Sequence, residues 1–117
     1  MRYALLIYGS EADYTKMMPD ERAAMMRGHA DLAAETQKRK MLTGGAQLQL
    51  TTTASTIRVR AGKILSTDGP FAETKEQLAG LYVLDCKDLD EAISMATKIP
   101  DVAFGSVEIR SILEFPD

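Results

Sequence analysis

The sequence lacks the residues that several common classes of protein require. Cys86 is its single cysteine, which excludes a disulfide within the chain and suits the reducing cytoplasm. A net charge of −3 excludes the basic surface typical of nucleic-acid binding. No hydrophobic run reaches the length of a membrane span, and the apolar residues 1–8 are too few for a signal peptide. We therefore expect a cytoplasmic protein with neither nucleic acid nor membrane as partner.

The sequence also lacks the short motifs that identify common catalytic and cofactor sites. It contains no phosphate-binding glycine loop, no nucleophile elbow and no nucleotide-binding fingerprint. One histidine among scattered acids falls well short of the paired spacing of a metal site. The isolated pair Gly44-Gly45 indicates the end of a helix. We therefore predict no metal and no cofactor.

What the chain does contain is enough apolar material for a core. Its 117 residues, 45% of them hydrophobic, predict one domain over residues 1–117. Cys86 ends the largely apolar run 81–86, so we interpret it as a small buried hydrophobe and not as a nucleophile.

Apolar periodicity and turn residues predict the element order β-α-β-(ββ)-β-α-β. Pro19 suits a first helical turn, and Asp88 followed by Glu91 is a capping box for a second helix that Pro100 stops. The expected buried stripe of the second helix is Leu89, Ala92, Ile93, Ala96 and Ile99. The expected strands are residues 2–8, 46–50, 56–60, 63–67, 79–86 and 106–115, and the first helix is residues 19–39.

This order predicts an α+β fold, a ferredoxin-like βαββαβ unit with an inserted β-hairpin. Two helices cover one face of a four-stranded sheet, yet both faces carry apolar residues, and we assign Leu6, Tyr8, Tyr82 and Leu84 to the uncovered side. An apolar sheet face needs cover, so we predict a homodimer whose sheets pack face to face. The alternative is a monomer whose hairpin folds over that face.

His29 is the single histidine and the one side chain that titrates near neutral pH without perturbation. It lies on the first helix beside Gly28, where its imidazole could reach a cavity next to the sheet. Asp101, just after the second helix, could place a carboxylate against that ring and raise its basicity. Both residues also fit plain structural roles, in the helix and in the loop.

The polar segment between the predicted hairpin and the next strand is a candidate binding loop, because binding residues favour loops on a rigid scaffold. The residues at its start, Asp68-Gly69-Pro70, are also explained by a turn alone, because Asp, Gly and Pro favour turns. Phe71 is expected to anchor the loop to the core, and Lys75 with Thr74 could hold an anionic group. The candidate ligand-binding residues are Asp68, Phe71, Glu73, Thr74 and Lys75.

Residues 68–80, with the sequence DGPFAETKEQLAG, resemble the defining motif of DGPF-domain proteins, a branch of the YCII-related family. The resemblance covers essentially the whole chain. It extends to residues 2–9, 19–21, 56–60, 89–92 and 107–110.

The resemblance implies a dimeric α+β barrel of ferredoxin-like subunits. A His–Asp pair has been proposed as the active site of the wider family, and His29 and Asp101 match its helix histidine and its post-helix aspartate. Some family members are joined to, or lie beside, extracytoplasmic-function sigma factors.

Two functions follow as hypotheses. The first is a small dimeric enzyme with a ligand pocket, in which His29 and Asp101 carry out acid-base chemistry on a small carbonyl or lactone compound. The second is a non-catalytic module that senses a small molecule or docks on a sigma factor.

Overall fold

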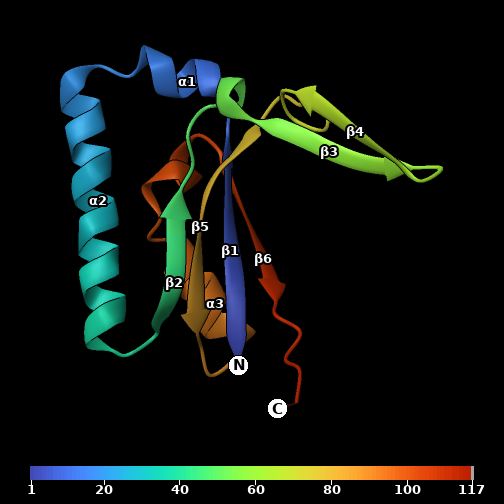
Figure 1. Cartoon of the computed structure of the whole chain (residues 1–117). Helices are drawn as coiled ribbons and strands as arrows, with labels where there is room; N and C mark the ends of the chain where they lie inside the picture. Colours follow the sequence, from blue (N-terminus) through green and yellow to red (C-terminus); the bar gives the residue numbers. More distant parts are fainter. Residues whose placement is uncertain (117) are drawn as a thin grey trace.

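The computed structural model describes residues 1–116, which form an α+β fold with the expected order of strands (Figure 1). The strands are β1 (Arg2–Gly9), β2 (Leu42–Gln47), β3 (Ser55–Arg60), β4 (Lys63–Asp68), β5 (Gln77–Asp85) and β6 (Ser106–Ser111). The helices are α1 (Glu11–Lys16), α2 (Pro19–Lys38) and α3 (Leu89–Ala96), with the 3-10 turns η1 (Thr51–Thr53) and η2 (Pro100–Ala103).

The main sheet is antiparallel and has the strand order β2-β5-β1-β6. This is the arrangement of a ferredoxin-like βαββαβ unit. Strands β3 and β4 form a separate two-stranded hairpin inserted between β2 and β5. The predicted fold class and the inserted hairpin are therefore confirmed.

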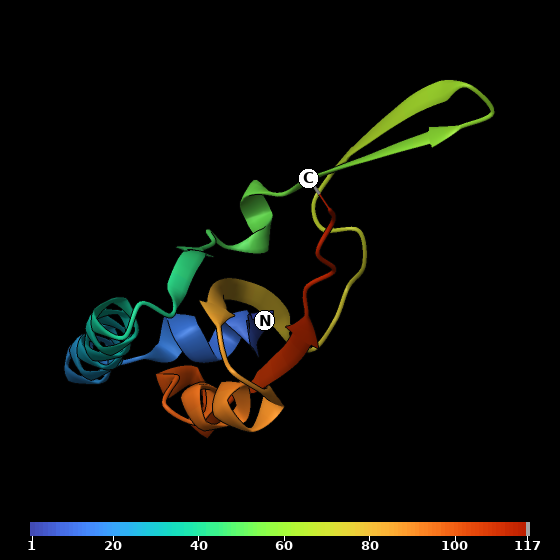
Figure 2. The same ribbon diagram turned by 90° about the horizontal axis from the view of Figure 1, so that it is seen from below.

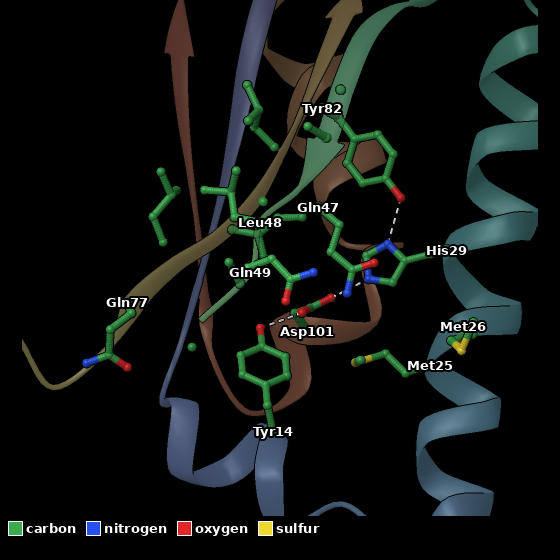
Figure 3. A pocket seen from close by; sticks show the side chains of 18 of the residues that line it. Tyr14, Met25, Met26, His29, Gln47, Leu48, Gln49, Gln77, Tyr82 and Asp101 are labelled. Carbon is green, nitrogen blue, oxygen red and sulfur yellow. Dashed lines mark hydrogen bonds and ion pairs between the residues drawn. The ribbon is translucent and has the colours of Figure 1, made fainter. Parts of the chain in front are cut away.

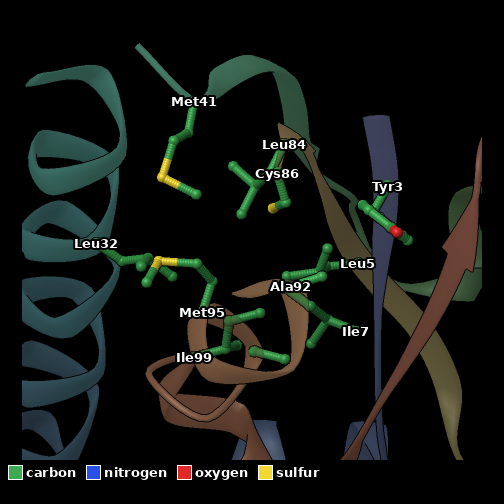
Figure 4. Close-up of a cluster of buried hydrophobic side chains, with 11 residues drawn as sticks. Tyr3, Leu5, Ile7, Leu32, Met41, Leu84, Cys86, Ala92, Met95 and Ile99 are labelled. Carbon is green, nitrogen blue, oxygen red and sulfur yellow. The ribbon is translucent and has the colours of Figure 1, made fainter. Parts of the chain in front are cut away.

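Helices α2 and α3 cover one face of this sheet and enclose the core (Figure 4). Strand β1 alternates strictly between buried and partly exposed residues, as a strand with one covered face should. Cys86 is buried within the cluster, which confirms it as a small core hydrophobe. The buried cluster is Tyr3, Leu5, Ile7, Leu32, Met41, Leu84, Cys86, Ala92, Met95, Ala96 and Ile99.

The opposite face of the sheet is not covered by the hairpin. Strands β3 and β4 extend away from the body of the protein in both views (Figures 1 and 2). Their apolar side chains Ile57, Val59 and Ile64 are exposed. The alternative in which the hairpin folds over the sheet is therefore wrong.

The assignment of strand residues to faces needs one correction. In the register, Tyr82 lies opposite Leu5 and Leu84 lies opposite Tyr3, so both belong to the covered face. The uncovered face is formed by Ala4, Leu6, Leu81 and Val83, which are all partly exposed. Because both faces are apolar, alternation alone could not fix this assignment.

The glycine pair was also misassigned, because Gly44 and Gly45 lie inside β2 instead of ending a helix. Helix α2 ends at Lys38, and Lys40 with a φ of 58° makes the turn. A Cβ at residue 45 would lie 2.9 Å from the backbone oxygen of Leu81. Glycine therefore allows β2 to approach β5, and the strand begins earlier than the predicted residues 46–50.

The chain differs from the prediction at three further points. Helix α1 was not expected, and β6 ends at Ser111, leaving Leu113 and Phe115 exposed. Helix α3 ends at Ala96, and Pro100 begins η2 instead of stopping the helix. The expected stripe of α3 is buried except for Leu89 and Ile93, which are exposed.

The predicted capping box of α3 is present in one half, since the Glu91 carboxylate accepts from the backbone N–H of Lys87 and not of Asp88. The Asp88 carboxylate accepts a hydrogen bond from the backbone N–H of Glu91, at 2.9 Å. No helix within residues 1–116 is both long and apolar enough to cross a membrane.

Candidate active site

A cavity of about 820 Å³ lies between α2 and the β2–β5 side of the sheet. Gly45 contributes to it by leaving no side chain opposite Tyr82, its partner in the register. Methionines 25 and 26 and His29 of α2 form one wall, and Tyr14 of α1 lies at one end (Figure 3). The cavity therefore combines apolar walls with a few polar side chains, as small-molecule sites usually do.

His29 extends from α2 toward the sheet and makes two short hydrogen bonds. Its Nδ1 lies 2.6 Å from the hydroxyl of Tyr82, and its Nε2 lies 2.6 Å from Oδ1 of Asp101. The imidazole and the Tyr82 ring are nearly parallel, with 5.9 Å between centroids and 19° between planes. The structure thus brings together the two residues that the sequence predicted as a pair.

A glycine in α2 explains how Asp101 reaches His29. A Cβ at residue 28 would lie only 2.6 Å from Cγ of Pro100. Glycine at this position lets η2 pack directly on α2, and the next residue of η2 is Asp101. The missing side chain of Gly28 therefore makes room for Pro100.

Asp101 is only 3% exposed and is held from two sides. The hydroxyl of Tyr14 donates to Oδ2 at 2.5 Å, while His29 occupies Oδ1. Burial alone would raise the pKa of this carboxyl, but the hydrogen bonds from His29 and Tyr14 outweigh it and hold the pKa below its ordinary value. Asp101 is therefore a carboxylate at neutral pH.

The ionised carboxylate of Asp101 determines which nitrogen of the His29 imidazole carries the proton. An ionised Asp101 only accepts hydrogen bonds, so Nε2 of a neutral His29 carries the proton and donates it. Nδ1 is then an acceptor, and the Tyr82 hydroxyl donates to it. Burial and the charge of Asp101 raise the pKa of Tyr82, and burial with the Asp101 hydrogen bond raises the pKa of Tyr14.

These contacts form a continuous chain of hydrogen bonds, from Tyr82 through His29 and Asp101 to Tyr14 (Figure 3). In residues 1–116, no buried side-chain nitrogen or oxygen lacks a partner. Chemically, the carboxylate orients the ring, favours one tautomer and stabilises the imidazolium that forms when the ring takes a proton.

The rim of the cavity is polar. Arg22 lines it and donates from Nη2 to the backbone oxygen of Tyr14 at 2.9 Å. Glu11 connects the rim to neighbouring segments, because its carboxylate accepts from the backbone N–H and the hydroxyl of Thr51 at 2.7 and 2.6 Å. The glutamines of the lining are Gln37, Gln47, Gln49 and Gln77.

The structure does not bring the predicted binding loop to this cavity. Asp68, Phe71, Glu73, Thr74 and Lys75 are all exposed, and none of them belongs to its lining. Phe71 is 78% exposed, so the expectation that it anchors the loop to the core is wrong. A ligand-binding role for these residues remains a prediction.

Sequence reasoning missed Tyr82 and Tyr14 as members of the site. A tyrosine within an apolar strand is a usable signal, because a buried phenol hydroxyl normally has a hydrogen-bond partner. Tyr14 gave no such signal, since it lies in the unexpected helix α1. Within residues 1–116, no three His, Cys, Asp or Glu side chains are grouped so that they could hold a metal ion.

A family model of the YCII-related domain matches residues 1–116 of the chain. The chain belongs to the YCII-related family. An uncharacterized protein of Rhizobium meliloti (strain 1021) is 40% identical over 119 residues, covering 96% of this chain and 92% of that protein. The matched residues therefore include all four members of the hydrogen-bond network, which are Tyr82, His29, Asp101 and Tyr14.

Proposed function

We propose that this YCII-related protein is an enzyme that moves protons on a small carbonyl or lactone compound bound in the cavity. His29 is the acid-base group and Asp101 is its orienting residue. The observation that carries the proposal is the 2.6 Å contact between the ring and a carboxylate that is almost fully buried at the cavity wall. Such pairs act in general acid-base catalysis.

The lining supports this class of ligand. Apolar side chains such as Met25 and Ile7 suit a small carbon skeleton, and amide groups around the rim suit carbonyl oxygens. Arg22 lines the cavity and supplies the cation for a ligand carboxylate, a role that the sequence analysis gave to Lys75 with Thr74. Lys75 itself lies outside the lining.

Proton abstraction next to a carbonyl can be measured without knowing the natural substrate. The protein is incubated in D₂O with α-angelica lactone, γ-butyrolactone or pyruvate, and proton NMR follows the loss of each C–H signal. We expect the protein to accelerate exchange of at least one compound, and His29→Gln to remove the acceleration. Glutamine can still donate to Asp101 but takes up no proton at neutral pH.

A matched control separates loss of chemistry from loss of folding. Tyr8→Phe alters the other face of the sheet, where the Tyr8 hydroxyl meets Glu108 at 3.3 Å, and should leave exchange unchanged. Undiminished exchange in a folded His29→Gln variant would remove His29 from the mechanism. Absence of exchange with the unaltered protein would contradict the enzyme proposal.

We further propose that the protein is a single-domain cytoplasmic homodimer of the DGPF type, with the uncovered sheet faces packed together. Leu6, Leu81 and Val83 support this arrangement, since they form an apolar patch that lacks cover within one subunit. Sedimentation equilibrium measures the mass of the assembly directly.

A second candidate is a non-catalytic, small-molecule-sensing module linked to sigma-factor-dependent transcription. It is favoured by the fact that both nitrogens of His29 already have partners within the protein, as in a purely structural network. In that case the His29→Gln variant keeps partner binding, and changes to residues 68–76 abolish it. A pull-down with a purified sigma factor, repeated with both variants, distinguishes the two functions.

A further inference from the structure

We propose that the hydroxyl of Tyr82, and not a nitrogen of His29, is the group that exchanges protons with the bound molecule. In this inference Tyr82 is a catalytic residue, and His29 stores the proton behind it. The inference rests on the proposed function of the same cavity and names the atom that touches the ligand.

The first argument is that both imidazole nitrogens are engaged. Nε2 is held at 2.6 Å by Asp101, which is 3% exposed, so no ligand can approach from that side. Nδ1 is held at 2.6 Å by Tyr82. His29 and Tyr82 both line the cavity. A ligand would have to displace a short hydrogen bond to reach either nitrogen of His29, whereas the Tyr82 oxygen donates one hydrogen bond and can still accept another.

The second argument is that the Tyr82 ring lies over a glycine of β2. Its register partner is Gly45, and a Cβ there would lie 3.7 Å from Cδ1 of the ring. This is an ordinary van der Waals distance, so the ring lies directly over Gly45, and a side chain longer than that of alanine would compete with it for this space. The 2.6 Å hydrogen bond to Nδ1 holds the hydroxyl against His29 at the wall of the cavity.

The charges around the hydroxyl suit a proton relay. The groups that face it are His29 from α2 and, behind the ring, Asp101 from η2, with Tyr14 from α1 bound to the far carboxylate oxygen. Because burial and Asp101 raise the pKa of Tyr82, its hydroxyl is protonated at neutral pH. A neutral hydroxyl both donates and accepts, so one oxygen can receive a proton while releasing another.

The step balances without a further reactant. The C–H bond next to the ligand carbonyl breaks, its electron pair stays on the ligand as an enolate, and the proton joins the Tyr82 oxygen. The original Tyr82 proton passes to Nδ1 of His29, giving an imidazolium stabilised by Asp101. Reversal of both transfers at a different ligand atom returns the site to its starting state and completes an isomerisation.

The test compares Tyr82→Phe with the unaltered protein in the D₂O exchange assay, using whichever of the three compounds exchanges fastest. Phenylalanine keeps the aromatic ring and removes only the hydroxyl. We expect exchange to fall by roughly 100-fold or more, the contribution usual for a positioned acid-base group. Tyr8→Phe, which removes a phenol hydroxyl from the other face, should exchange at the unaltered rate.

The outcomes separate this inference from the proposed function. Loss of exchange in both Tyr82→Phe and His29→Gln supports the relay, provided that circular dichroism shows both variants folded. Retained or faster exchange in Tyr82→Phe, with loss in His29→Gln, overturns the role of Tyr82 and leaves His29 as the contacting group. No exchange with the unaltered protein overturns both proposals together.

Discussion

The two faces of the main sheet are built from the same strands, yet they differ in what covers them. In β1, Leu5 is completely buried under the helices, whereas the next residue, Leu6, lies on the uncovered face and is partly exposed. The covered face also holds the cavity and its network of tyrosines, histidine and aspartate. Two equally hydrophobic residues of one strand can therefore have different roles. The helices bury one face of the sheet, and that face forms both the core and the cavity, whereas the other face lacks cover.

The largest expected effect comes from testing the two leucines against each other. Leu5→Ala should lower the free energy of unfolding by about 2–5 kcal/mol, because the core closes poorly around a lost side chain. Leu6→Ala should cost far less at low protein concentration. Urea unfolding of both variants measures the difference, and equal losses would contradict the distinction between the faces.

The uncovered face can be tested by placing a charge on it. Val83→Lys should raise the dissociation constant of the proposed homodimer at least about tenfold, since an unpaired ammonium between two apolar faces costs more than about 1.4 kcal/mol. Sedimentation equilibrium measures this constant. If the unaltered protein is a monomer, or the variant stays dimeric, the face-to-face arrangement is wrong.

On the covered face, Asp101→Asn should lower the free energy of unfolding at pH 7 by about 1–3 kcal/mol, because it removes a buried, doubly hydrogen-bonded carboxylate. The folded pKa of Asp101 lies below the unfolded value of about 4. Its contribution is therefore fully present above pH 4 and is lost as the pH falls through the folded pKa.

Unfolding curves of the unaltered protein and of Asp101→Asn should accordingly converge as the pH falls below about 4. Glu35→Gln is a comparison variant, because Lys98 and Arg39 lower the pKa of Glu35 as well. Its gap should close over the same pH range but be smaller, since ion pairs at the surface contribute little. A gap between the Asp101 curves that stays constant down to pH 2 would contradict the lowered pKa.

The smallest expected effects concern the glycine pair of β2, whose members face opposite sides of the sheet. A Cβ at Gly44 would meet Val83 at an ordinary 3.8 Å, so Gly44→Ala should be neutral or stabilise by up to about 1 kcal/mol. A Cβ at Gly45 would lie 2.9 Å from a backbone oxygen, so Gly45→Ala should destabilise. Thermal unfolding measures which of the two variants is more stable. A Gly45→Ala variant more stable than Gly44→Ala would contradict the register between β2 and β5.

The element order could be predicted because helices, turns and the hairpin each carry local signals. The turn at Ala61-Gly62, where both residues have positive φ, and the Asp88 cap are examples. The pairing of His29 with Asp101 was expected from their places in the chain and from the family resemblance. The structure adds the contact itself.

Tyr82 and the cavity could not be predicted for a physical reason. The face of β5 that a residue occupies depends on the register of β5 with β1 and β2. When both sides of a strand are apolar, the sequence pattern does not show which register is formed. The site also needs glycine at residue 28 and a missing side chain at residue 45. Glycine at residue 28 makes room for Pro100, and glycine at residue 45 makes room for the backbone oxygen of Leu81, and both partners are distant in sequence.

The hairpin has a further consequence for how this fold can vary. Its two ends leave the sheet between β2 and β5, which are neighbours, and the backbone N–H of Leu48 bonds to the oxygen of Ala79 beyond the end of β2. The hairpin is therefore an elaborated turn between adjacent strands. Its length and sequence can change without breaking a hydrogen bond of the sheet, which makes it a natural position for grafting a foreign segment.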